Sequence, residues 1–237
     1  QRYGSWLFNM VRGDMGKSLL SRMQVSQLIG FALPATMLLT LAVIIVALVI
    51  GIPLGILLAY KNGTTFDVVV TVFQGVLLAL PNFWLGILLI LIFSVELRWL
   101  PSTGYIPFFE NPLLAIKFLI LPVIALGSRL TAEISRFVKH SMLETLKEDY
   151  VRTARAKGIP MVKILFKHVL RNALVPITSM IGVRFGALLG GTVIVETVFS
   201  WPGIGRLIVQ AVGNRDYPVM LAGLVILIVM FVIVNLA

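Results

Sequence analysis

The run MQVSQLIGFALPATMLLTLAVIIVALVIGIPLGILLAY, residues 23–60, contains no charged side chain. Crossing ~30 Å of hydrocarbon at ~1.5 Å per residue takes ~20 residues of helix. The run can therefore supply one membrane-spanning helix, which we expect at about 33–60. The composition agrees, because 59% of the 237 residues are hydrophobic and only 13% are charged, whereas soluble domains have about 25% charged residues.

Four further spans are predicted from apolar runs that turns or charges separate, at about 68–95, 113–135, 173–195 and 218–237. Pro81-Asn82 should kink or break the second span, which membrane helices tolerate when neighbours satisfy the freed carbonyls. The predicted fold class is an all-α polytopic membrane protein with five spans in this sequence. The spans occupy 33–237 and follow an amphipathic lead-in at 1–32, which is either an interfacial helix or an ordered loop.

The positive charge is concentrated in one segment. Ten of the 20 Lys and Arg residues lie between Arg129 and Arg171, so the positive-inside rule assigns 136–171 to the cytoplasm. Alternation assigns 61–67 to the same side and assigns 1–32, 96–112 and 196–217 to the outside. The cations of the lead-in oppose this orientation but are outnumbered. The net charge of +10 is thus explained by the orientation of the chain in the membrane, and no nucleic-acid partner is expected.

Two motifs that suggest catalysis or metal binding do not fit those roles. GDMGKS at 13–18 has Val11 where a phosphate-binding loop needs its first glycine. His140 and His168 stand among cations, and the chain has no cysteine, so surface histidines are favoured over metal ligands. No nucleophile–base set can be assembled. We expect no enzyme activity, no metal and no cofactor bound by this chain.

Small residues recur at a spacing of four in two spans. Gly182, Gly186 and Gly190 share one face of the fourth span, and Gly51 and Gly55 repeat the pattern in the first. Such spacing lets helix backbones approach closely in lipid. Helix packing is favoured, and a subunit interface or the wall of a pathway is the alternative.

Charged residues also occur within the predicted spans. Arg184 is costly there unless it faces water or a partner, so it either lines an aqueous cavity or snorkels or pairs with a carboxylate. Both interpretations stay open. Arg129 and Glu133 are spaced i, i+4 and are expected to form an ion pair at the membrane edge.

The cytoplasmic segment reads ETLKEDYVRTARAKGIPMVKILFKHVLRNALVP at 144–176. It predicts an amphipathic helix over 144–157, with a flat patch formed by Ala154, Ala156 and Gly158. Gly158-Ile159-Pro160 should end that helix, and a second helix should begin near Met161. Anchoring to anionic lipid explains the basic charge. The small, flat turn favours a protein partner.

Several motifs resemble one family in order and spacing: DYVRTARAKG at 149–158, HVLRNALVP at 168–176, LLGG at 188–191 and ETVFSWPGIGRL at 196–207. They are similar to the permeases of ABC importers, specifically the "B"-type subunits of the dipeptide/oligopeptide/nickel family. GDMGKS and ALPATMLLTL, at 32–41, also fit. The resemblance covers essentially the whole chain. It implies a type I ABC importer transmembrane domain, with a sixth span before Gln1 and a short tail after Ala237.

The resemblance also implies a site. Residues 139–171, here called the coupling segment, would contain a coupling helix around 153–158 that sits in a groove of an ATPase subunit. Arg152, Thr153 and Ala154 take the places of the family's Glu-Ala-Ala, as the peptide subfamily is written. The implied coupling residues are Asp149, Tyr150, Arg152, Thr153, Ala154, Arg155, Ala156, Lys157 and Gly158.

The implied function is that of a permease subunit in a bacterial or archaeal cytoplasmic membrane. A homologous permease, two ATPase subunits that bind ATP and Mg, and an extracytoplasmic substrate-binding protein would be its partners. Peptides are the favoured substrates, and nickel or a metal chelate is the alternative. A secondary transporter would need inverted repeats and acidic residues near mid-membrane, and a receptor or scaffold would not explain the coupling segment.

Overall fold

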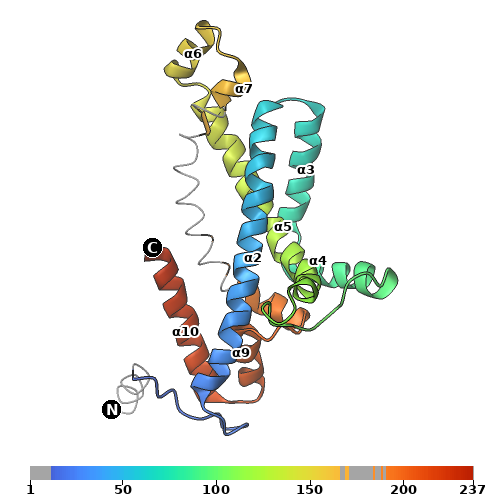
Figure 1. Ribbon diagram of the computed structural model, residues 1–237, viewed down its shortest axis with the longest axis vertical. Helices are drawn as coiled ribbons and strands as arrows, with labels where there is room; N and C mark the ends of the chain where they lie inside the picture. Colours follow the sequence, from blue (N-terminus) through green and yellow to red (C-terminus); the bar gives the residue numbers. More distant parts are fainter. Residues whose placement is uncertain (1–11, 166–168, 171–183, 185–187, 189–190, 237) are drawn as a thin grey trace. The chain divides into compact units, whose positions relative to one another are not determined.

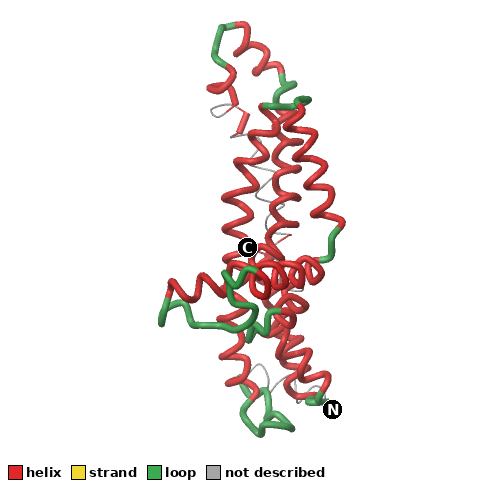
Figure 2. The backbone as a smooth tube through the Cα atoms, turned by 90° about the vertical axis from the view of Figure 1, so that its right-hand side faces the viewer, coloured by secondary structure: helices red, strands yellow, loops and turns green. Residues whose placement is uncertain are grey.

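The computed structural model describes residues 12–165, 169, 170, 184, 188 and 191–236. Within this part every regular element is a helix, and extended backbone pairs only at an isolated bridge between Lys17 and Gln24. Figure 2 shows the same composition of helices and loops. The predicted all-α class is confirmed.

Two helices are long and apolar enough to cross a membrane by themselves, α2 (Val25–Tyr60) and α5 (Pro112–Thr145). α2 begins eight residues before the predicted start, because neither a charge nor a proline interrupts 25–32. The third span was predicted to end near 135, but α5 continues beyond that position. Residues 136–145 contain neither Gly nor Pro, so the helix continues through this charged stretch. The third span and the start of the coupling segment are therefore one helix.

A third candidate span is broken in the middle. α3 (Thr65–Ala79) is followed by α4 (Asn82–Leu89) and the π-helical η1 (Ile90–Glu96), with a bend of 102° between α3 and the pair after it. The bend falls at Pro81, whose ring removes a backbone donor and restricts the preceding residue. This confirms the predicted break.

The remaining apolar helices are shorter. α9 (Ile204–Gly213) lies in the predicted loop 196–217, and α10 (Tyr217–Leu236) matches the predicted last span. The predicted span at 173–195 lies largely outside the described residues, although residues 191–198 are helical.

The chain divides into two compact units, and the first comprises residues 1–42, 82–126 and 185–237. In Figure 1, α9 and α10 lie beside the start of α2. Their shared core consists of Val25, Ile29, Ala32, Ile204, Ile208, Ala211, Val219 and Ala222. Residues 12–24 of the lead-in are an ordered loop, in which the Ser18 N–H donates to the Met23 carbonyl at 2.9 Å.

The second unit comprises residues 43–81 and 127–184. In its described part, the second halves of α2 and α5 pack closely where α2 carries Gly51 and Gly55. A Cβ atom at Gly55 would lie 2.6 Å from the Cβ of Val138 and 2.7 Å from the backbone oxygen of Ser135. The prediction that this pair of glycines serves helix packing is confirmed. On α3, Gln74 Nε2 donates to Ser135 Oγ at 3.0 Å.

Candidate functional site

The candidate coupling site is a pair of short helices that follows α5. α6 (Asp149–Ala156) and α7 (Met161–Ile164) appear at the top of Figure 1. The sequence predicted a helix from Glu144, but Glu144 belongs to α5. Glu148 is extended (φ −64°, ψ 147°) and separates the two helices. The helix predicted over 144–157 is therefore shorter, is α6 alone, and is separated from α5 by a turn.

α6 has a buried face and an exposed face. Val151 is 0% exposed and Ala154 is 9% exposed, so both anchor the helix against the rest of the chain. Ala154 was predicted to share a flat surface patch with Ala156 and Gly158, and this is wrong because helical periodicity turns it inward. The exposed face consists of Asp149, Tyr150, Arg152, Thr153, Arg155 and Ala156.

The turn after α6 requires glycine for its backbone conformation. Gly158 has a φ of +75°, in the left-handed region that L side chains rarely adopt. Its N–H donates to the Arg155 carbonyl at 2.9 Å. A Cβ atom there would meet no atom within 4 Å, so space is not the restriction. α7 then starts at Met161 directly after Pro160, which confirms the predicted turn and second helix.

The exposed face of α6 and its C-cap residue are mainly basic. Arg152, Arg155 and Lys157 are exposed, with Asp149 as the one acid of α6. Arg152 Nη1 lies 3.7 Å from Asp149 Oδ1. Both side chains are more than four-fifths exposed, so this ion pair contributes little stability. These cations stay in contact with water, where an acidic partner surface can reach them.

The base of the coupling segment is fixed to the first turn of α3. Lys139 Nζ lies 2.5 Å from Asp67 Oδ1, and the two side chains are only 19% and 8% exposed. The Gly63 N–H donates to Asp67 Oδ2 at 3.0 Å. Breaking a largely buried ion pair is costly, so a displacement of this part of α5 should carry α3 with it. Sequence reasoning missed this pair, since 72 residues separate its members.

Glu133 on α5 binds two arginines. Arg129 Nε lies 3.2 Å from Glu133 Oε1, which confirms the predicted ion pair. Arg184 Nε lies 3.2 Å from Glu133 Oε2. The carboxylate partner considered for Arg184 is thus present within the same chain. The other predicted residues of this span, Gly182, Gly186 and Gly190, lie outside the described residues.

In the first unit, a buried carboxylate holds the segment that leads into α9. Glu196 is 0% exposed. Its Oε1 accepts the Thr36 hydroxyl at 2.7 Å, and its Oε2 accepts the Arg206 backbone N–H at 3.0 Å. Thr36 Oγ1 in turn accepts the Ile204 N–H at 2.8 Å. Glu196 and Thr36 together cap the N-terminus of α9, where Gly203 offers no side chain.

Packing around this carboxylate explains the sequence WPGIG at 201–205. A Cβ atom at Gly203 would overlap the Glu196 carboxylate, and one at Gly205 would meet the backbone of the preceding helix. Trp201 is buried, and its indole N–H donates to a backbone carbonyl of α2 at 2.8 Å. A lone acid at the end of an apolar run, followed by spaced glycines, was the available sequence signal for this cap.

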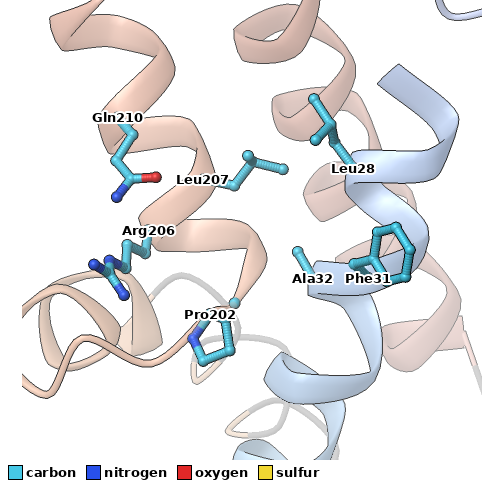
Figure 3. Close-up of a pocket in the computed structure, with 8 residues that line it drawn as sticks. Leu28, Phe31, Ala32, Pro202, Arg206, Leu207 and Gln210 are labelled. Atoms are coloured by element: carbon cyan, nitrogen blue, oxygen red, sulfur yellow. The ribbon is translucent and has the colours of Figure 1, made fainter. Parts of the chain in front are cut away.

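A hollow of about 280 Å³ opens beside this cap, between α2 and α9 (Figure 3). Its lining consists of Leu28, Phe31, Ala32, Pro202, Gly203, Arg206, Leu207 and Gln210. The Arg206 guanidinium already donates to the Ser200 carbonyl. Because this guanidinium is already hydrogen-bonded to the backbone, the hollow offers mainly apolar contacts.

The GDMGKS motif makes a structural contact. The Ser18 hydroxyl donates to Asp216 Oδ2 at 2.5 Å, and the Leu19 N–H donates to Oδ1 at 3.1 Å. Burial by itself would raise the pKa of Asp216, but the hydrogen bonds from Ser18, Leu19 and other backbone N–H groups outweigh it and hold that pKa below its ordinary value. The motif therefore ties the lead-in loop to the turn before α10.

Metal-binding chemistry is not visible in the described part of the chain. It contains no group of three or more His, Asp or Glu side chains that could hold a metal ion. His140 Nε2 lies 3.3 Å from Glu144 Oε1, on side chains that are 73% and 65% exposed, so it is a surface histidine as predicted. His168 lies outside the described residues.

Comparison with known proteins extends these observations. Residues 51–237 match the family described as "Binding-protein-dependent transport system inner membrane component". The oligopeptide transport system permease protein AppB of Bacillus subtilis is 43% identical, over 99% of this chain and 75% of that protein. The dipeptide transport system permease protein DppB of Alkalihalophilus pseudofirmus is 39% identical, over 99% of this chain and 77% of that protein.

Solved structures share the fold at lower identity. A chain of the MetNI methionine ABC transporter in inward-facing conformations aligns with a TM-score of 0.72 and 21% identity, covering 89% of this chain and 92% of that one. An amino acid ABC transporter crystallised with histidines aligns with a TM-score of 0.65 and 17% identity, over 89% and 90% of the two chains. The fold is that of an all-helical ABC importer transmembrane domain. With the family match over most of its length, the chain belongs to the binding-protein-dependent transport system inner membrane components.

Proposed function

We propose that this chain is the permease subunit of an ATP-driven peptide importer and that it builds the translocation pathway with a homologous permease. Relatives named for oligopeptide and dipeptide transport, similar over 99% of the chain, support peptides as the substrate class. A substrate-binding protein outside the membrane delivers the peptide, as dependence on a binding protein implies. Nickel or a metal chelate is the alternative that a transport assay must separate.

The proposed topology has five spans in this sequence and six in the intact subunit. In this proposal four of the five would be α2, the broken pair of α3 with α4 and η1, α5, and the shorter apolar helix α10. The fifth corresponds to the apolar run at 173–195. The coupling segment at 139–171 faces the cytoplasm because it holds the main cluster of cations. The lead-in at 1–32 and the loops at 96–112 and 196–217 face outside.

In this proposal α6 docks in a groove of an ATPase subunit. The observation that carries it is the build of α6, which packs Val151 and Ala154 inward and exposes Arg152, Thr153 and Arg155. α6 follows directly on α5, the helix that continues into the membrane span. Closure of the ATPase pair on ATP and Mg would pull α6. α5 and the Asp67–Lys139 ion pair then pass this displacement to the spans.

The docking part can be tested by cross-linking. Because the chain contains no cysteine, a single introduced cysteine gives an unambiguous product. Thr153→Cys on the exposed face of α6 should form a disulfide with cysteines placed in the groove of the co-expressed ATPase. Lys61→Cys, exposed on the other cytoplasmic turn, and Thr103→Cys, exposed on an outside loop, are matched controls. Equal cross-linking from all three positions contradicts docking through α6.

The substrate part requires reconstitution of the permease pair with its ATPases and cognate binding protein in proteoliposomes. ATP-dependent uptake of a labelled dipeptide or oligopeptide supports the proposal. Uptake of nickel in the absence of peptide uptake moves the assignment to the metal alternative. Uptake driven by an ion gradient and independent of ATP contradicts the importer itself.

A further inference from the structure

A hollow of about 340 Å³ lies between α3 and α5 in the second unit. Its lining consists of Thr71, Arg136, Lys139, His140 and Leu143. The four α5 positions follow the i, i+3, i+4, i+7 spacing of a single helical stripe. Three of the five lining side chains are basic, and no carboxylate is among them. We propose that this hollow binds the phosphate headgroup of an anionic phospholipid in the cytoplasmic leaflet.

The depth of the hollow suits a headgroup. On α3, Thr71 lies one turn inside the expected start of the span at 68, and on α5 the basic stripe begins at Arg136, after the expected end of the span at 135. The two helices therefore bracket the boundary between hydrocarbon and water. Val68 and Val72 are 58% and 63% exposed on α3 beside Thr71, where an acyl chain would lie.

The charges that surround the hollow single out one cation. Lys139 already pairs with Asp67, and His140 lies 3.3 Å from Glu144. Arg136 is exposed and has no ion pair within the described residues. Its planar guanidinium can donate two parallel hydrogen bonds to a phosphate, which a lysine cannot. Arg136 is therefore the main attraction for the headgroup.

Two further donors are in reach of the same ligand. The Thr71 hydroxyl donates to Asp67 Oδ1 at 3.3 Å, which is a long bond that a phosphate oxygen can replace. The imidazole of His140 supplies an N–H group from the same stripe as Arg136. Basic pockets between transmembrane helices on the cytoplasmic side bind anionic headgroups. The composition and the depth of this hollow both match that description.

A lipid here would touch the base of the coupling segment, because Lys139 lines the hollow and also holds Asp67. The inference thus adds a ligand site at the point where α5 is tied to α3. It rests on the proposed membrane orientation, but not on the peptide substrate or on docking through α6. Its failure is therefore distinguishable from failure of the importer function.

The test uses the full-length permease, purified with its co-expressed partners in a neutral detergent. After addition of phosphatidylglycerol or phosphatidylcholine, native mass spectrometry counts the lipids that remain bound. Wild type should retain phosphatidylglycerol in preference to phosphatidylcholine. Arg136→Gln should weaken that retention about fivefold, the effect of one basic residue at an anionic membrane surface. Arg136→Lys keeps the charge but loses the paired donors, so its retention should fall between those of wild type and Arg136→Gln.

Lys61→Gln is the matched control, because it removes the same charge from an exposed turn of the same unit outside the hollow. It should retain phosphatidylglycerol as wild type does. Equal retention in Lys61→Gln and Arg136→Gln overturns the lipid site. Displacement of the lipid by inorganic phosphate alone would make it a site for free anions. Loss of the homologous permease from the Arg136→Gln complex would make this face a subunit interface instead.

Discussion

At the scale of residues, Glu196 caps the N-terminus of α9. It does so from a neighbouring helix, because the N-cap residue Gly203 has no side chain. Its carboxylate accepts the Thr36 hydroxyl and the Arg206 N–H with no exposure to solvent. Glu196→Ala would leave the buried Thr36 hydroxyl and the part-buried Arg206 N–H without this acceptor, at a cost of about 1–3 kcal/mol for a fully buried donor. We expect this variant to unfold at a clearly lower temperature than wild type when the detergent-purified complex is heated.

Two companion variants separate capping from mere loss of a charge. Glu196→Gln keeps the volume and one acceptor oxygen, so its unfolding temperature should fall between those of wild type and Glu196→Ala. Glu96→Ala removes an exposed carboxylate at the end of η1 and should stay within about 0.5 kcal/mol of wild type. If Glu196→Ala and Glu96→Ala unfold at the same temperature, Glu196 does not stabilise α9.

Asp216 predicts a dependence of stability on pH. Its folded-state pKa lies below the ordinary value of 3.8 because Ser18 and backbone N–H groups hydrogen-bond the carboxylate more strongly than burial disfavours it. The unfolded chain therefore takes up this proton first as pH falls. The contribution of Asp216 is complete above pH 3.8 and is lost as pH falls through the folded-state pKa.

Asp216→Asn should therefore lower the unfolding temperature at neutral pH and flatten its decline below pH 3.8. The asparagine cannot accept both the Ser18 hydroxyl and the Leu19 N–H. Glu110→Gln, at an exposed position, should leave the pH profile of wild type unchanged. Parallel profiles for wild type and Asp216→Asn would remove Asp216 from the acid transition.

At the scale of elements, the approach of α2 to α5 depends on Gly55. A Cβ atom there would lie 2.6 Å from the Cβ of Val138, so one helix must move. Overpacking of this kind costs about 1–3 kcal/mol, and Gly55→Ala should lower the unfolding temperature. Gly75→Ala on α3 meets no atom within 4 Å and should be neutral or stabilising, because alanine favours helix. Equal behaviour of the two variants contradicts close packing at Gly55.

Elements could be predicted where one physical property decides them. The charge-free run at 23–60 predicted α2, and the missing N–H of Pro81 predicted the break after α3. The end of α5 could not be predicted in the same way. The charges at 136–145 favoured an end of the span near 135, but a helix can continue past charged residues when neither Gly nor Pro interrupts it.

The candidate site, too, could be predicted only where a residue's own chemistry decides the structure. Gly158 and Pro160 fix a turn through their own backbone chemistry, so sequence located it. Ala154 and Ala156 are two positions apart and face different sides of α6, so the predicted shared patch was wrong, and packing decides which side is buried. The pairs of Glu196 with Thr36 and of Asp67 with Lys139 join residues 160 and 72 positions apart. No local pattern carries such contacts.

At the scale of the whole molecule, the turn at Gly158 should decide whether ATP hydrolysis is coupled to transport. A side chain in the left-handed region costs about 1–2 kcal/mol, so Gly158→Ala must distort the link between α6 and α7. No atom lies within 4 Å of the added Cβ, so the spans have no reason to unfold. We expect peptide uptake into proteoliposomes to fall several-fold while ATP hydrolysis persists and the unfolding temperature is unchanged.

Two further variants test whether uncoupling requires strain at this turn or follows from backbone strain anywhere in the chain. Gly13→Ala imposes the same left-handed strain on the lead-in loop, where φ is +88° and space is equally open, and it should preserve the ratio of uptake to hydrolysis. Asparagine tolerates the left-handed region, so Gly158→Asn should stay coupled if backbone conformation is what α6 needs. Uncoupling by Gly158→Asn would instead indicate that the turn contacts the ATPase so closely that no side chain fits at position 158. A wild-type ratio in Gly158→Ala would refute the coupling role of this turn.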